Sequence, residues 1–383
     1  MKKIVIIGAG EFQIQLIEKA KELGYETHVF AWEEGAVGKE ISDYFYPISI
    51  VEKELILDKC KDIKPECVVS IGSDLAVLTV NYISRELGLN ANPEEVDLIA
   101  TNKYEMRKAF QKANVEIPKF VKTNQVSEKI YSELKKFRFP LIVKPTDRSG
   151  SRGIRKVNSL EEVDEAVHAA VKESFEKYAI IEEYVEGNEY SCESISFEGQ
   201  HYILAFTKKY TTGSPDFIET AHIQPSDIPE DLKDIIICEI KKALDALHIK
   251  TGASHCEFKL SNSGEVRIIE IGARMGGDCI GSDLVKISTG YDYIKMVIDT
   301  AKGEQPDFSK ISSPKWAFVR FIFNKSDYEM VKAIKELNPD LLYRYSVSDD
   351  IGTHKVTDSS SRFGYFILSS ENMGDLKEYI PKI

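Results

Sequence analysis

Two glutamates, Glu257 and Glu270, lie on neighbouring segments that the sequence predicts to be the two strands of a hairpin. Residues 251–260 (TGASHCEFKL) and 265–271 (EVRIIEI) are typical of strands, and a turn over 263–264 would connect them. In that register Glu257 lies opposite Glu270 on one face of the hairpin, with the Cα atoms about 5 Å apart.

Carboxylates placed directly opposite each other repel, and a divalent cation between them makes the arrangement favourable. Mg²⁺ binds one or two carboxylates together with phosphate oxygens, because it gives up its waters reluctantly. The pair therefore predicts a metal site, although an exposed hairpin face with ordinary charge remains the alternative. The other face is predicted to point into the core and carries Phe258, Leu260, Ile269 and Ile271.

An arginine and paired glycines follow the second glutamate. Arg274 can donate both arms of its guanidinium to a carboxylate or phosphate, and Gly276 and Gly277 allow backbone N–H groups to come close to an anion. This order of residues predicts that an anion binds beside the metal.

A lysine and a Gly/Ser-rich loop form a second candidate. Lys144 ends the predicted buried strand 139–145, and the loop 146–153 (TDRSGSRG) contains Arg148 and Arg152. A lysine supplies a point charge, and such a loop supplies backbone and hydroxyl donors to phosphate. The loop lacks the Walker A pattern, and a solvated turn is the alternative to a phosphate cover.

Alternating strands and helices over about 90 residues predict a Rossmann-like parallel sheet that precedes these motifs. The strands are expected at 3–8, 26–32 and 67–71, and the helices at 11–23, 52–62 and 75–87. Gly8 and Gly10 begin a dinucleotide fingerprint, but Gln13 occupies its third glycine position. An oxidoreductase built on this turn would leave the lysine and glutamate motifs unexplained, so a tight turn is favoured, with an anion contact as the alternative.

The remaining segments give further expectations. A helix is predicted over 94–113, a capping box at Ser159 and Glu162, and a hairpin over 189–207. A long helix is predicted from Pro229 to about His248. A small α/β unit is expected after about 306.

Composition excludes several classes of protein. The chain has 383 residues, 43% hydrophobic and 29% charged, as in a globular protein of two or three domains. Its net charge of −12 argues against nucleic acid as a partner, and no apolar run is long enough for a membrane span. The N-terminal apolar run favours a strand over a signal peptide. Six cysteines without a CxxC pair favour reduced thiols and a cytoplasmic location.

Three motifs in this order and spacing resemble the ATP-grasp superfamily: KPTDRSGSRGI from Lys144, EEYVEGNEYS from Glu182, and HCEFKL with IIEIGARMGGD from His255. The resemblance covers essentially the whole chain and is closest to the L-amino acid ligases, with carbamoyl-phosphate-synthetase-like and biotin-carboxylase-like proteins more distant. It implies a mixed α/β and α+β fold. The expected parts are a Rossmann-like domain (1–112), the small lobe (113–186) and the large lobe (187–305) of an ATP-grasp, and a C-terminal subdomain (306–383).

The resemblance also implies roles for the nucleotide-binding residues. Lys103 and Lys144 would contact the phosphates of ATP, and Glu189 would hold the ribose. The flexible loop over the phosphates would contain Ser149, Gly150 and Ser151. The hinge between the lobes would be Glu182, Glu183, Tyr184 and Val185. The backbone of Glu183 and Val185 would read adenine, and one hinge carboxylate would reach an adenine amine or the ribose.

The resemblance assigns Glu257 and Glu270 to Mg²⁺ (or Mn²⁺) and Arg274 to the transferring phosphoryl group. Many relatives place an asparagine two residues after the second glutamate, where this chain has Gly272, which leaves the number of metal ions open. Substrate contacts are expected from Glu219 and His222, with Arg274, Gly276 and Gly277. A structural pair is the alternative for Glu219 and His222. His255 is expected to support the metal face or contact substrate, with a purely structural role as the alternative.

The expected activity is that of an ATP- and Mg²⁺-dependent ligase. It would join a small carboxylate, an amino acid, to an amine through an acyl phosphate and release ADP and phosphate. Its partners would be these two small molecules, with a homodimer possible. The alternatives are an ATP-grasp enzyme that acts on another carboxylate and a non-catalytic ATP-binding protein.

Overall fold

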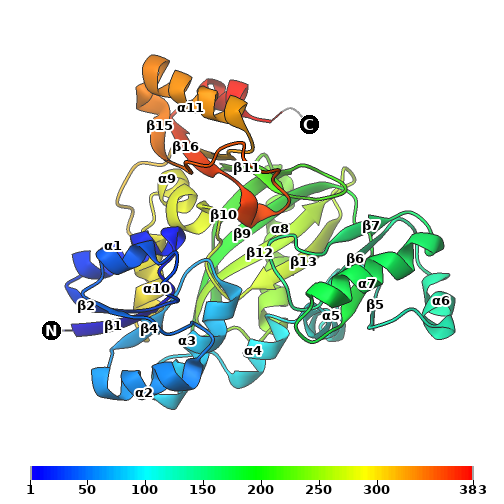
Figure 1. Ribbon diagram of the computed structural model, residues 1–383, viewed down its shortest axis with the longest axis horizontal. Coiled ribbons are helices and arrows are strands. Elements are labelled where there is room, and N and C mark those ends of the chain that lie inside the picture. The colour runs from blue at the N-terminus through cyan, green and yellow to red at the C-terminus, as the bar shows by residue number, and fades with distance from the viewer. Residues whose placement is uncertain (1, 382–383) are drawn as a thin grey trace.

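The computed structural model describes residues 2–381 and builds them around three β-sheets (Figure 1). The N-terminal sheet has four parallel strands in the order β3-β2-β1-β4. Its elements are β1 (Lys2–Ile7), α1 (Ile14–Glu22), β2 (Tyr25–Phe30), β3 (Tyr44–Tyr46), α2 (Lys53–Ile63), β4 (Cys67–Val69) and α3 (Asp74–Glu86). Parallel strands need crossover helices, and the predicted alternation of strands and helices is confirmed.

The turn after β1 is a packed structural turn. Gly8 has φ +105°, and the Gln13 side chain lies against it and donates from Nε2 to the Ile71 carbonyl at 2.9 Å. This glutamine therefore ties the turn to the segment after β4, as the weak fingerprint suggested.

The second sheet is antiparallel, has the order β5-β8-β6-β7, and carries the loop 146–153. Its elements are β5 (Phe120–Thr123), α6 (Glu128–Leu134), β6 (Leu141–Pro145), β7 (Arg155–Val157), α7 (Val163–Glu173) and β8 (Ala179–Glu183). We call it the small lobe. Figure 1 shows it (green, right) and the N-terminal sheet (blue, left) on opposite sides of the third sheet.

The third sheet has eight strands in the order β13-β12-β9-β10-β11-β14-β16-β15. Its elements are β9 (Asn188–Phe197), β10 (Gln200–Thr211), β11 (Glu219–Gln224), α8 (Glu230–Ala246), β12 (Gly252–Leu260), β13 (Val266–Gly272), α9 (Val285–Thr289), α10 (Tyr293–Ala301), β14 (Trp316–Phe321), α11 (Lys325–Leu337), β15 (Leu342–Val347) and β16 (Gly364–Ser370). The C-terminal strands thus extend the sheet that carries the two glutamates. The division into four domains stays a prediction.

The predicted helix over 94–113 is in fact two helices, α4 (Glu94–Ile99) and α5 (Lys103–Lys112). Asn102 separates them, because its side chain accepts hydrogen bonds from the backbone N–H groups of Tyr104 and Glu105. Such an N-cap begins a new helix. The break places Lys103 in the first turn of α5.

The β12–β13 hairpin has the predicted glutamate pair but a different register beyond it. Glu257 faces Glu270, and a β-bulge then pairs Phe258 with Ile268. A bulge adds one residue to one strand and re-aims its side chains. The prediction that Ile269 points into the core is therefore wrong: Ile269 lines the pocket next to Glu270, and Ile268 is the core residue.

The predicted capping box at Ser159 is not formed. A short 3₁₀ turn (Leu160–Glu162) precedes α7, and the Ser159 side chain makes no capping hydrogen bond. The Glu162 carboxylate instead accepts from the backbone N–H of Asn158 at 2.9 Å.

Two class-level expectations can be compared with the described residues 2–381. None of their helices is both long enough and apolar enough to cross a bilayer. All six cysteines are free thiols, and only Cys238 is exposed.

Candidate active site

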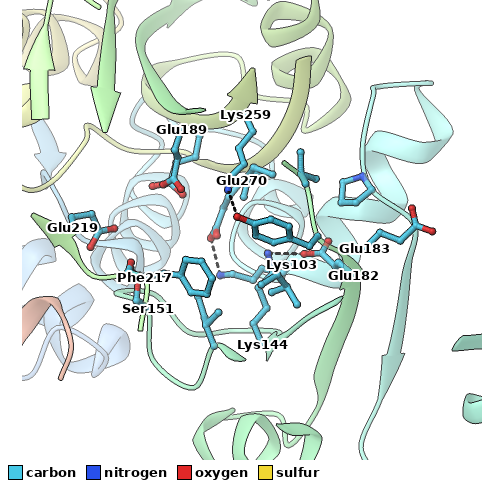
Figure 2. Close-up of a pocket in the computed structure, with 17 residues that line it drawn as sticks. Lys103, Lys144, Ser151, Glu182, Glu183, Glu189, Phe217, Glu219, Lys259 and Glu270 are labelled. Atoms are coloured by element: carbon cyan, nitrogen blue, oxygen red, sulfur yellow. Dashed lines mark hydrogen bonds and ion pairs between the residues drawn. The ribbon is translucent and has the colours of Figure 1, made fainter. Parts of the chain in front are cut away.

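A pocket of about 770 Å³, open to solvent, lies between the small lobe and the large sheet (Figure 2). The small lobe and the large sheet both supply walls of this pocket, and residues 182–185 line the end where the two meet. The predicted residues that line it are Lys103, Lys144, Ser151, Glu182, Glu183, Tyr184, Val185, Glu189, Glu219, Glu257 and Glu270. Lys103 and Glu270, which are 167 positions apart, are therefore brought together.

Glu182 anchors the floor of this pocket. Its buried carboxylate accepts from Arg107 and from Lys144, whose Nζ lies at 2.7 Å. Burial alone favours the neutral acid, but these two cations lower the pKa of Glu182 to about 2. Burial also lowers the pKa of Lys144, although Glu182 opposes that change. The hinge carboxylate thus holds the Lys144 ammonium at the pocket surface.

Lys103 connects the metal pair with the loop 146–153. From the first turn of α5, its Nζ donates to Glu270 Oε1 at 2.8 Å and to the Arg148 carbonyl at 2.7 Å. Figure 2 shows the contact with Glu270. Two lysines that come from different elements therefore meet at the predicted phosphate end of the pocket.

A third lysine, Lys209 on β10, was missed in the sequence. Its Nζ contacts Glu257 at 2.6 Å, Glu189 at 3.1 Å and Glu219 at 3.7 Å. Burial alone lowers the pKa of an ammonium, but the three carboxylates hold the pKa of Lys209 well above its usual range. The available signal was strand parity, since Lys209 shares the buried face of β10 with Thr207.

The two facing glutamates fit a magnesium ion that shares its coordination with phosphate. In the described part of the chain, the side-chain cations contact only Oε1 of each carboxylate: Lys209 on Glu257 and Lys103 on Glu270. Among residues 2–381 no cluster of three or more His, Cys, Asp or Glu side chains is placed to hold a metal ion. Two carboxylates are the number that Mg²⁺ uses beside a nucleotide.

His255 lies between the carboxylates of Glu193 and Glu257. Its Nδ1 contacts the buried carboxylate of Glu193, and its Nε2 lies 3.4 Å from Glu257 Oε1. Burial lowers the pKa of an imidazole, but Glu193 and Glu257 outweigh it and raise the pKa of His255 to about 9. Glu193 Oε2 also accepts from the Gly276 N–H at 2.8 Å, and a Cβ there would lie 2.4 Å from the other carboxylate oxygen. The glycine is required by this close approach.

The hinge end of the pocket is apolar with cationic edges. The Tyr184 ring lies 4.0 Å from Lys156 Nζ and 4.7 Å from Lys259 Nζ. Ile142, Ile154, Phe217 and Ile269 complete the walls. A flat aromatic base suits such a slot.

The two hinge carboxylates both have protein partners. That of Glu182 is bound by Lys144 and Arg107, and that of Glu183 accepts from the Arg138 N–H at 2.8 Å. The contact of one of them with an adenine amine or the ribose stays a prediction. The backbone roles of Glu183 and Val185 stay predictions.

The loop 146–153 lies across the mouth of the pocket. Ser151 donates to the Phe217 carbonyl at 3.1 Å, and Gly150 and Ser151 both have positive φ, +72° and +59°. Ser149 lines a second cavity of about 500 Å³, which shares Lys103 and Glu270 with the first. The loop therefore lies between two cavities that both reach Lys103 and Glu270.

Arg274 does not line this pocket. Its guanidinium forms a two-point pair with Asp74 of α3, at 2.7 Å and 3.2 Å. The N-terminal layer thus reaches the segment that follows the metal strand. A Cβ at Gly272 would lie 3.1 Å from Asp74 Oδ1 and 3.2 Å from the Arg274 guanidinium carbon, so this pair accounts for the glycine at that position. Gly277 packs beside the Gly72 carbonyl.

Glu219 and His222 on β11 lie at the far side of Lys209. Glu219 is in the pocket wall, whereas the His222 ring is buried and its Nε2 is 3.7 Å from Asp278. Burial lowers the pKa of His222, although Asp278 opposes it. We call Glu219, His222 and Asp278, together with Arg362 and the Arg274–Asp74 pair, the substrate side.

Known proteins share this architecture. Residues 137–283 match the ATP-grasp domain family. An alanine–anticapsin ligase from Bacillus subtilis is 28% identical over 308 residues, which span 71% of this chain and 64% of that ligase. The chain therefore matches a little under two thirds of the length of that relative.

Solved structures show the same fold over nearly the whole chain. An L-amino acid ligase from Bacillus licheniformis has a TM-score of 0.82 at 21% identity and covers 99% of this chain and 96% of its own. The ADP complex of an N5-carboxyaminoimidazole ribonucleotide synthetase has a TM-score of 0.79 at 17% identity, with 98% and 94% covered. Residues 137–283 therefore carry an ATP-grasp domain, and the solved structures show that nearly the whole chain shares the fold of these proteins.

Proposed function

We propose that this chain is an ATP- and Mg²⁺-dependent ligase that joins an amino acid, through its carboxyl group, to an amine. The observation that carries the proposal is a cluster of buried lysines beside two facing carboxylates. Lys103 contacts Glu270, Lys209 contacts Glu257, and Lys144 is held nearby by Glu182. Buried cations beside a metal pair suit a triphosphate, whose charge they neutralise without having to reorganise.

In the first step a carboxylate oxygen attacks the γ-phosphorus of ATP. The bond from that phosphorus to the bridging oxygen breaks, and ADP leaves with the electron pair. Lys144 and Lys103 stabilise the charge that spreads over the phosphate oxygens. Mg²⁺, held by Glu257 and Glu270, would neutralise the same oxygens. The product is an acyl phosphate.

In the second step the neutral amine attacks the acyl carbon. The carbon–oxygen bond to phosphate breaks, phosphate leaves, and the nitrogen loses a proton to give the amide. Water would hydrolyse the acyl phosphate, so the loop 146–153, with Ser149, Gly150 and Ser151, would act as a lid.

The residues on the substrate side would bind the amino acid and the amine. Glu219, with Arg274, Gly276 and Gly277, would take this role, and the buried His222 would support it beside Asp278. The likeness to ligases of amino acids supports this class of substrate.

A screen of L-amino acid pairs with Mg-ATP tests the proposal. We expect amide, ADP and phosphate in equal amounts for at least one pair, and loss of product when EDTA removes the metal. Lys144→Met should lower kcat/KM by about 10²-fold, because its charge acts in the transition state.

Lys136→Met is the matched control, because Lys136 belongs to the same lobe and its side chain is 69% exposed. Its kinetics should equal those of the wild type. Amide formation at an unchanged rate in Lys144→Met, or no ADP from any pair, would refute the proposed function.

A further inference from the structure

A segment close to the C-terminus reaches the substrate side of the site. Residues 358–361 form a capped 3₁₀ turn between β15 and β16, in which the Asp358 side chain accepts from the N–H groups of Ser360 and Ser361. The cap fixes the direction of the two side chains that matter here, Ser359 and Arg362. Ser359 contacts Glu219 of β11, and Arg362 contacts both Glu219 and Asp278, which lies after β13.

Arg362 holds Asp278. Its Nη1 and Nη2 donate to the two carboxylate oxygens at 2.9 Å and 2.6 Å, and its side chain is 6% exposed. The guanidinium lies over the Phe321 ring at 3.7 Å. Burial by itself favours a neutral Asp278, but Arg362 and His222 hold the pKa of Asp278 well below its usual range. The carboxylate is therefore an acceptor only.

The same arginine and the neighbouring serine fix Glu219. Arg362 Nη1 lies 3.4 Å from the Glu219 carbonyl, and Ser359 Oγ donates to Glu219 Oε2 at 2.6 Å. The other carboxylate oxygen lies 3.7 Å from Lys209, the lysine that contacts the metal ligand Glu257. Glu219 is thus fixed from both sides, next to the metal centre.

Arg362 has few donors left for a substrate anion. A guanidinium has five N–H groups. Besides the two on Asp278, Nε donates to the Ser359 carbonyl at 2.7 Å. With the contact from Nη1 to the Glu219 carbonyl, four of the five N–H groups have protein acceptors, so the effect of Arg362 on substrate passes mainly through the carboxylates that it orients. Asp278 and Glu219 keep 22% and 16% of their side chains exposed.

We propose that Arg362 is a positioning residue, which with Ser359 orients Asp278 and Glu219 as acceptors for the amino group of the amino-acid substrate. The assignment rests on the proposed function and deepens it. Two ionised carboxylates that only accept hydrogen bonds select a group rich in N–H donors, and an ammonium has three. The C-terminal segment thereby sets specificity without touching substrate.

A second arginine–aspartate pair offers a matched control. Arg344 on β15 contacts Asp283 at 2.8 Å, so it joins the same C-terminal strands to the same segment, 278–284. Asp283 belongs to the π-helical turn Ile280–Leu284 and lines a separate groove with Gln15 and Lys19. Arg344 also lies 3.9 Å from Cys279 Sγ, but it contacts neither Asp278 nor Glu219, so its removal costs an ion pair to the same segment without removing a partner of these two carboxylates.

The test compares Arg362→Met, Arg362→Lys, Asp278→Asn and Arg344→Met with the wild type. Each receives the best amino-acid pair from the screen and, in place of the amino acid whose carboxyl group enters the amide, the analogue of that amino acid without its amino group. Arg362→Met should raise KM for one amino acid at least about tenfold, because it removes one partner of a buried, hydrogen-bonded charge pair. KM for ATP should change by less than about twofold, since Lys103 and Lys144 are untouched. Arg362→Lys should fall short of full rescue, because a lysine cannot bind both carboxylate oxygens in parallel.

The preference for the amino acid over its analogue distinguishes positioning from stability. It should shrink in Arg362→Met and in Asp278→Asn and stay unchanged in Arg344→Met, even if all three variants lose thermal stability. Combining Arg362→Met with Asp278→Asn should add little, because the two residues act as a unit.

Equal loss of preference in Arg344→Met, or an unchanged preference in Arg362→Met, would overturn the assignment and leave the proposed function standing. A wild type that uses the analogue as well as the amino acid would also overturn it. A wild type that ligates no pair would remove the proposed function, and this assignment with it.

Discussion

The nucleotide side and the substrate side of the pocket are both built from paired charges, but they are assembled differently. On the nucleotide side, lysine ammonium groups contact single carboxylate oxygens, as Lys103 does with Glu270 and Lys144 with Glu182. On the substrate side, Arg274 and Arg362 each hold an aspartate by two points. An ammonium is a point charge that can change partner, whereas a guanidinium fork fixes geometry.

The two regions also differ in where their residues come from. The nucleotide side uses elements of the two ATP-grasp lobes and the helix before them. The substrate side joins Asp74 of the N-terminal layer, Asp278 of the large lobe and Arg362 near the C-terminus. Both sides therefore join distant residues, but the nucleotide side stays within residues 103–270, whereas the substrate side also draws on the N-terminal layer and the C-terminal strands.

The largest effect is expected at the metal pair. Glu270→Ala and Glu257→Ala should each lower kcat by about 10²–10³-fold or more, the cost of removing a group that stabilises transition-state charge. Glu265→Ala is the control, since Glu265 begins the returning side of the same hairpin and its side chain is 65% exposed. Steady-state rates at saturating Mg²⁺ measure this. A normal rate in either pair variant would remove the metal assignment.

The next effect concerns the buried anchor of the nucleotide side. The pKa of Glu182 is about 2, against an ordinary value of 4.5. Because the folded-state pKa is depressed, this group contributes stability above about pH 4.5 and loses it as the pH falls towards 2. The shift corresponds to about 3 kcal/mol at neutral pH.

Glu182→Gln should therefore unfold in less urea than the wild type at pH 7, and the difference should narrow at acid pH. Urea titrations across this range provide the measurement. A difference independent of pH would mean that Glu182 contributes through packing and not through its charge.

A smaller effect is expected where the N-terminal layer meets the substrate side. Asp74→Asn should loosen Arg274 and raise KM for an amino-acid substrate by about three- to tenfold, because one charge of the pair remains without its partner. KM for ATP should hold. Asp58→Asn is the control, because Asp58 lies in the same layer and its side chain is 71% exposed. An effect on ATP alone would place Arg274 with the nucleotide.

The smallest effect concerns local opening. Cys256, beside Glu257, lies on a central strand of the large sheet, whereas Cys279 follows Asp278 in a turn with φ +63°. Burial holds the pKa of both thiols well above its usual range. Side-chain pairs hold the turn and a backbone ladder holds the strand, so Cys279 should open first.

Alkylation of the native chain, followed by mass spectrometry, should label exposed Cys238 first, then Cys279, and Cys256 last. Arg362→Met should speed labelling of Cys279 and leave Cys256 unchanged. Labelling of Cys256 before Cys279 would show that the turn at Cys279 does not open more readily than the strand at Cys256.

Local sequence patterns were enough to predict much of the fold and many residues of the nucleotide side. A short turn sets hairpin register, so the pairing of Glu257 with Glu270 could be predicted, and burial of β1 could be read from its β-branched run. The bulge that turns Ile269 to the pocket could not, because it depends on packing beneath the sheet. The cap at Asn102 could have been read from residue type, yet the apolar pattern on both sides favoured one continuous helix.

The substrate side was predictable only in part, because its contacts join residues that no spacing rule connects. Arg362 lies 84 positions from Asp278, and Asp74 lies 200 positions from Arg274. Lys209 follows Lys208 on its strand, and without the fold the sequence alone does not say which face of that strand is buried. Such pairs form only when the chain folds, whereas a sequence motif shows only residues that lie close together in the sequence.

The oxygen that leaves with phosphate tests the central claim most directly. The substrate carboxylate is labelled with ¹⁸O, the amide-forming reaction is run, and the phosphate is analysed by mass spectrometry. An acyl phosphate requires that one labelled oxygen per amide appear in phosphate, with ADP as the nucleotide product, because that oxygen attacks the γ-phosphorus and leaves with it. Unlabelled phosphate during amide formation, or AMP as the product, would contradict the proposed mechanism.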